Sequence, residues 1–136
     1  MRLDMYLYGA SYTINGETLQ GTLKLDVVAY WRKQNAIHKF FVDEVQDSID
    51  NCAMYWVSIE TLDKLKTRCE NVLNNPSFEN AMAVLPTQGG FFFGGTDLTN
   101  DFEMEYYLDG LKYTVEVLNE LLDNNSYEYY YYNSSW

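Results

Sequence analysis

The chain has 136 residues, a length that suits one domain comprising residues 1–136. Its 20 acidic and 9 basic residues give a formal charge of -11, which argues against direct nucleic-acid binding because DNA and RNA phosphates would be repelled. One histidine, two cysteines without a Cys-x-x-Cys pair and no long apolar run argue against a structural zinc site and a membrane segment.

The first thirty residues predict an antiparallel hairpin. Apolar Leu3, Met5 and Leu7 alternate with more polar residues over residues 3–12, which is the period of a half-buried strand. Asn15-Gly16 supplies the two positive-φ positions of a tight turn. Residues 18–28 alternate in the same way, so they predict the second strand of the hairpin.

Residues 30–46 predict the central helix. At about 100° per residue, their apolar side chains form one stripe that must face a core. The stripe consists of Tyr30, Ile37, Phe41 and Val45. Trp31, Asn35 and His38 lie along one shoulder of this stripe, with Arg32 further round on the same side. An indole, an amide, an imidazole and a guanidinium would therefore share one helix surface.

The rest of the chain predicts further strands and helices, and the fold class is α+β. The expected sheet is antiparallel, contains the N-terminal hairpin and later strands, and packs with about three helices. The next expected elements are a strand at 52–57, a helix capped by Ser58 and stopped at Asn74-Asn75-Pro76, and a helical turn or two at 77–85 capped by Ser77. They are followed by a short buried strand around Phe91, a long helix starting at 99–101, and a tyrosine-rich C-terminal strand at 127–136.

The predicted site combines the central helix with a glycine-containing turn. Its expected ligand-binding residues are Trp31, Arg32, Asn35, His38, Thr87 and Gln88. Arginine can bind a carboxylate or phosphate with two hydrogen bonds, histidine titrates near neutral pH, and tryptophan stacks on planar rings. Core packing for the ring side chains and solvent exposure for the cations remain the simpler interpretation of the same pattern.

Two other functions stay open at this stage. His38 is the single imidazole, so acid–base catalysis on a nucleotide or sugar-phosphate would pass through it. Alternatively, an acidic helix surface that includes Glu103 and Glu105 would imitate nucleic acid and bind a basic host protein.

At several places the chain resembles a family of small, largely uncharacterised proteins of bacteriophages and prophages. The matching pieces are Leu3-Asp4-Met5-Tyr6-Leu7, Tyr30-Trp31-Arg32-Lys33 with Asn35 and Ile37-His38, Leu85-Pro86-Thr87-Gln88 with Gly90-Phe91-Phe92-Phe93-Gly94, and Ser134-Ser135-Trp136. The chain departs from the family at Arg2, where glycine is usual, and at Phe40-Phe41, where tryptophan tends to follow the histidine.

The resemblance implies an accessory role during phage infection, in the host cytoplasm. Together with the residue chemistry, it leads us to expect a non-catalytic antagonist of host defence that binds a small nucleotide-like anion or a host protein. No cofactor, no metal and no membrane contact are expected, and a homo-oligomer is compatible with the sequence.

Overall fold

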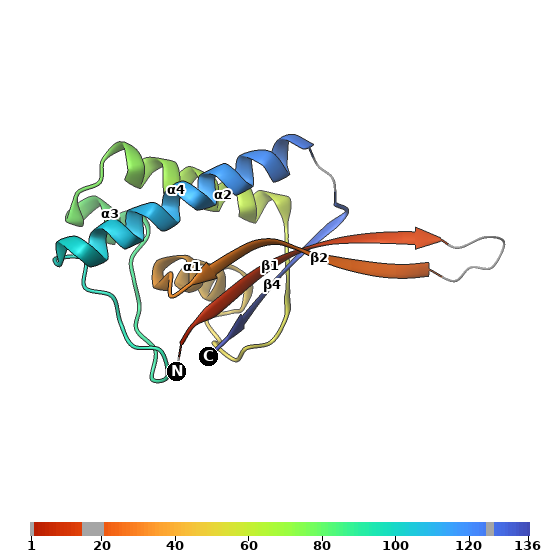
Figure 1. The fold of residues 1–136 in the computed structure, drawn as a ribbon, viewed down its shortest axis with the longest axis horizontal. Helices are drawn as coiled ribbons and strands as arrows, with labels where there is room; N and C mark the ends of the chain where they lie inside the picture. The colour runs from red at the N-terminus through yellow and green to blue at the C-terminus, as the bar shows by residue number, and fades with distance from the viewer. Residues whose placement is uncertain (1, 15–20, 125–126) are drawn as a thin grey trace.

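The protein folds as an open antiparallel sheet packed against helices, so the α+β prediction is confirmed (Figure 1). A computed structural model describes residues 2–14, 21–124 and 127–136. The elements are β1 (Asp4–Ile14), β2 (Gly21–Arg32), α1 (Asn35–Val45), β3 (Tyr55–Val57), α2 (Ile59–Asn74), α3 (Phe78–Val84), α4 (Asp101–Asn124) and β4 (Tyr129–Ser135). The strand order is β2-β1-β4-β3, so the C-terminal strand lies inside the sheet.

The N-terminal hairpin is longer than predicted, and the central helix is correspondingly shorter. β2 continues to Arg32, and α1 begins at Asn35, so the prediction of helix from Tyr30 is wrong. Lys33 adopts a positive φ of 47°, which ends the strand, and its N–H donates to the carbonyl of Leu3 at 2.8 Å. The predicted turn at Asn15-Gly16 lies outside the described residues.

The later helices begin where hydroxyl and amide side chains can cap them. Ser58 accepts a hydrogen bond from the N–H of Thr61 at the start of α2, and Ser77 accepts one from Asn80 at the start of α3. The side chain of Asn100 accepts one from the N–H of Glu103 at the start of α4. Both predicted serine caps are confirmed, as is the end of α2 at Asn74.

The region around Phe91 is a tight turn, so the predicted buried strand there is wrong. Gly90 and Gly94 exchange two backbone hydrogen bonds of 3.0 and 2.9 Å, and Gly94 has a φ of 72° that favours glycine. Phe91 at the tip is 95% exposed, whereas Phe93 turns inward and is buried. We call residues 88–95 the glycine loop.

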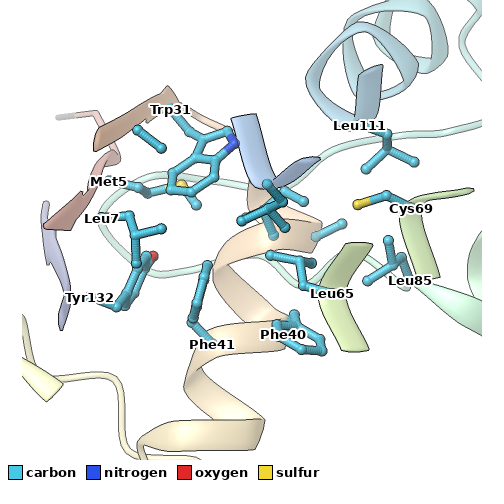
Figure 2. Close-up of a cluster of buried hydrophobic side chains, with 14 of the residues drawn as sticks. Met5, Leu7, Trp31, Phe40, Phe41, Leu65, Cys69, Leu85, Leu111 and Tyr132 are labelled. Atoms are coloured by element: carbon cyan, nitrogen blue, oxygen red, sulfur yellow. The ribbon is translucent and has the colours of Figure 1, made fainter. Parts of the chain in front are cut away.

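The core lies between one face of the sheet and all four helices. Leu3, just before β1, and Met5 and Leu7 within it are buried on this face, and the buried Tyr132 of β4 stacks on Phe41 of α1 with ring centroids 4.0 Å apart. Figure 2 shows Met5, Leu7, Phe41 and Tyr132 near Leu65 of α2 and Leu111 of α4 in this core. Burial of each such side chain contributes about 1.5–3 kcal/mol.

None of the helices in the described part of the chain is long and apolar enough to cross a bilayer.

Candidate functional site

The buried side chain of His38, in α1, has both of its ring nitrogens engaged in a hydrogen-bond network. Nδ1 lies 2.6 Å from the hydroxyl of Tyr132, and Nε2 lies 3.0 Å from both carboxylate oxygens of Asp50. The indole N–H of Trp136 also donates to Asp50, at 2.9 Å. The network therefore ties α1 to the segment that follows it and to the C-terminal end of β4.

Burial decides the protonation of this network. Desolvation lowers the pKa of His38, although the hydrogen bond to Asp50 and the charge of Asp50 act in the opposite direction. Burial also holds the pKa of Tyr132 well above its usual range, so its hydroxyl keeps its proton and donates to Nδ1. The neutral imidazole then donates from Nε2 to Asp50. Neither ring nitrogen of this tautomer is free to exchange a proton with a ligand.

This network predicts a stability change at mildly acidic pH. In the folded protein the pKa of His38 lies below its ordinary value of 6.5. As the pH falls, His38 is therefore protonated in the unfolded chain before it is protonated in the folded chain. Stability should therefore fall as the pH decreases from about 7.5 to about 5.5, above the usual range of carboxyl titration. We expect chemical denaturation to show a flatter pH dependence for His38→Gln, whose amide can still donate and accept. If the unfolding free energy of the native protein and that of His38→Gln changed equally with pH, His38 would not be the group responsible.

A hollow of about 300 Å³ opens beside His38, which we call the His38 hollow. It is lined by His38, Lys39, Val42, Asp43, Ser48, Asp50, Gln88, Gly89 and Phe93. The ammonium group of Lys39 is paired with Asp43, and the hydroxyl of Ser48 donates to the same carboxylate at 3.2 Å. Because its carboxylates outnumber its cations, the His38 hollow is a poor site for an anion.

Hydrogen bonds from the side chain of Asn35 connect the start of α1 to the glycine loop. The buried side-chain amide donates to the backbone carbonyls of Gln88 and Gly94, at 3.3 and 3.0 Å. The hydroxyl of Thr87 donates to the carbonyl of Thr96 at 3.4 Å, which joins the two ends of the loop. Thr87 and Asn35 thus shape the loop, while the exposed side chain of Gln88 lies at the rim of the His38 hollow.

Trp31 lies apart from both the glycine loop and His38. It is 2% exposed, its indole N–H donates to the hydroxyl of Thr114 in α4 at 2.9 Å, and its ring packs near Phe41 and Tyr113. As a core residue on the helix-facing side of β2, Trp31 is not placed to stack on a ligand.

Arg32 points to a second hollow, of about 410 Å³, between the end of β2 and the first turns of α4. We call it the Arg32 hollow, and it is lined by Arg32, Lys33, Thr96, Phe102, Glu103 and Tyr106. Phe102 is 79% exposed and Tyr106 is 43% exposed, so both rings are available to a ligand.

Two contacts hold the walls of the Arg32 hollow in place. The hydroxyl of Tyr106 donates to the carbonyl of Arg32, and the side chain of Gln34 donates to the carbonyl of Tyr106 at 3.1 Å. Gly110 leaves room for this glutamine, since a Cβ there would lie 2.2 Å from the Gln34 side chain. The walls are therefore fixed to one another before any ligand binds.

The structure thus divides the predicted site residues among three places. Asn35, His38, Thr87 and Gln88 lie in or beside the glycine loop, Arg32 lies in the other hollow, and Trp31 is in the core. Sequence reasoning missed Phe102 and Tyr106 as partners of Arg32, although their spacing of four residues off the apolar stripe of α4 was a usable signal. It also missed Asp50, Tyr132 and Trp136 as partners of His38.

Comparison of the chain with protein-family models, curated proteins and solved structures found no match.

Proposed function

We propose that this is a phage accessory protein that binds a small nucleotide-like anion in the Arg32 hollow, without catalysis, and so antagonises a host defence that depends on such a molecule. The observation that carries the binding proposal is the pairing of two cationic side chains with two exposed aromatic rings in one hollow. The motif resemblance supports the phage role.

The charge distribution supports an anionic ligand. The whole chain carries a formal charge of -11, yet Arg32 and Lys33 stand side by side at the end of β2. Within the described part of the chain, neither side chain takes part in a salt bridge. Glu103 is the one carboxylate among the lining residues. A phosphate or carboxylate would therefore find hydrogen-bond donors that are not already paired with a carboxylate.

The aromatic rings support a planar group on that anion. Phe102 and Tyr106 are four residues apart on α4, so they lie on the same face of the helix. Stacking of a base on an aromatic side chain is worth about 1–3 kcal/mol. The carboxylate of Glu103 would accept hydrogen bonds from the hydroxyl groups of a ribose. These groups together match a nucleotide better than they match inorganic phosphate.

The position of His38 favours binding over turnover. This imidazole lines the other hollow, and both of its nitrogens are engaged within the protein. The Arg32 hollow contains no imidazole or thiol among its lining residues. The groups present there can hold an anion and a ring, which is sufficient for sequestration.

The test is calorimetric titration with adenosine and guanosine monophosphates, a cyclic dinucleotide and inorganic phosphate. We expect Arg32→Ala to weaken nucleotide binding about 10- to 100-fold, since a charge-assisted hydrogen bond contributes about 1.5–3 kcal/mol. Lys112→Ala is the matched control, because it removes the same charge from an exposed position of α4. Unfolding free energies should stay within about 0.5 kcal/mol of the native value in both variants.

Aromatic variants separate nucleotide recognition from simple anion binding. Phe102→Ala should weaken nucleotide binding about tenfold and leave phosphate binding unchanged. Phe91→Ala removes a phenylalanine from the glycine loop that is even more exposed than Phe102, and it should change neither nucleotide binding nor phosphate binding. Failure of every nucleotide to bind the native protein, or equal binding by the native protein and Arg32→Ala, would overturn the proposal.

A further inference from the structure

The hairpin of β1 and β2 extends beyond the rest of the sheet. β4 pairs with β1 only from Asp4 to Ala10, so residues 11–14 and 21–24 form a two-stranded arm that projects from the molecule (Figure 1). Isolated two-stranded ribbons are marginally stable in water, and a third strand stabilises them. A further strand paired with this arm would therefore stabilise it.

β2 forms the edge of the sheet, and only its end near the helices is covered. The N–H of Tyr30 points away from β1 and donates to the hydroxyl of Tyr113 in α4, at 3.1 Å. The register shifts at Val28, and beyond it the alternation of strand hydrogen bonds directs the N–H groups of Leu25 and Val27 outward as well. Within residues 2–14, 21–124 and 127–136, no strand pairs with this edge.

Side chains along the open part of β2 are both apolar and charged. Leu25 is 41% exposed and Val27 is 57% exposed, on the face of the sheet opposite the helices. Lys24 and Asp26 lie on the other face, with their charged groups 3.8 Å apart and side chains 73% and 38% exposed. Lysine alone on an edge strand would repel a second copy, whereas lysine followed two residues later by aspartate attracts one.

We propose that a second copy of this chain pairs with β2, edge to edge and antiparallel, to form a symmetric dimer with a continuous sheet. A two-fold axis at Leu25 places this residue opposite its equivalent in the second copy. In that register Lys24 faces Asp26 of the second copy, and Asp26 faces its Lys24. Residues directly opposite one another interact most strongly across a strand pair, so both charged pairs are favourable. The outward N–H groups of Leu25 and Val27 gain carbonyl partners.

Charge reversal tests both the dimer and its register. Sedimentation equilibrium of the native 136-residue chain should show reversible association from 15.9 kDa to twice that mass as the concentration rises. Lys24→Asp or Asp26→Lys alone places like charges opposite one another and should raise the dissociation constant at least about tenfold. The double variant K24D/D26K restores opposite charges and should recover most of the native association.

The comparison of variants has an internal control for folding. The carboxylate of Asp26 also accepts a hydrogen bond from the hydroxyl of Tyr127, at 3.0 Å, and Asp26→Lys loses that bond in both the single and double variants. The two variants also differ in the charge pair of residues 24 and 26 within one copy, 3.8 Å apart in the native chain, so the unfolding free energy of each is measured beside its dissociation constant. A recovery of association that exceeds any recovery of stability reports the contact between copies. A native protein that stays at 15.9 kDa at all concentrations, or a double variant no better than the singles, would overturn the proposal.

Discussion

Replacing Trp31 with alanine is expected to lower the free energy of unfolding by about 3–5 kcal/mol, the usual cost of removing a large buried aromatic side chain. The indole is 2% exposed and packs near Phe41 and Tyr113, so its removal leaves a cavity between the sheet and α1. It also removes the hydrogen bond to Thr114. Urea denaturation followed by circular dichroism at far-ultraviolet wavelengths measures the loss.

Trp31→Phe separates packing from hydrogen bonding at this position. Phenylalanine keeps most of the apolar contact but loses the N–H donor, and the hydroxyl of Thr114 still donates to the carbonyl of Gly110 at 2.7 Å. We therefore expect Trp31→Phe to cost about 1–2 kcal/mol, much less than the alanine variant. A loss below about 1 kcal/mol in Trp31→Ala would contradict the core position and would return this residue to the set of candidate ligand contacts.

The central helix was predicted to begin at Tyr30 but begins at Asn35, and this error has a physical explanation. Tyr30 and Trp31 fit the apolar stripe of a helix and the alternation of a strand equally well, because short aromatic segments satisfy both periods. The boundary is decided by a distant contact, the hydrogen bond from the N–H of Lys33 to Leu3, which no local pattern contains. Beyond the boundary the helical pattern holds, since Ile37 and Phe41 are both fully buried.

That shift of boundary also separated residues of the predicted site. On a continuous helix, Arg32 and His38 would share one surface. In the structure the strand carries Arg32 toward α4, while His38 faces the glycine loop. Hydrogen-bond partners far along the chain, such as Tyr132 for His38, leave no local signal. By contrast, the alternation of the hairpin, the serine caps and the tyrosine-rich last strand were predictable because each depends on neighbouring residues.

Asn35→Ala is expected to lower the free energy of unfolding by about 1–3 kcal/mol and to loosen the glycine loop. The buried amide donates to the carbonyls of Gln88 and Gly94. The Gly94 carbonyl still accepts from the N–H of Gly90 after the substitution, so the cost is that of the Gln88 carbonyl losing its partner. Because Phe91 is 95% exposed at the loop tip, chymotrypsin cleavage after it reports the loosening directly. Asn35→Ala should be cleaved faster than the native protein under conditions in which both stay folded.

Gln88→Ala is the matched control, since the carbonyl of residue 88 and its bond to Asn35 survive the substitution. Its side chain is exposed, so stability should change by no more than about 0.5 kcal/mol and the cleavage rate should stay native. The two variants together distinguish a loop held by its backbone from one held by its side chains. If Gln88→Ala loosened the loop and Asn35→Ala did not, the side chain of Gln88 would be the anchor, and the role given to the buried amide would be wrong.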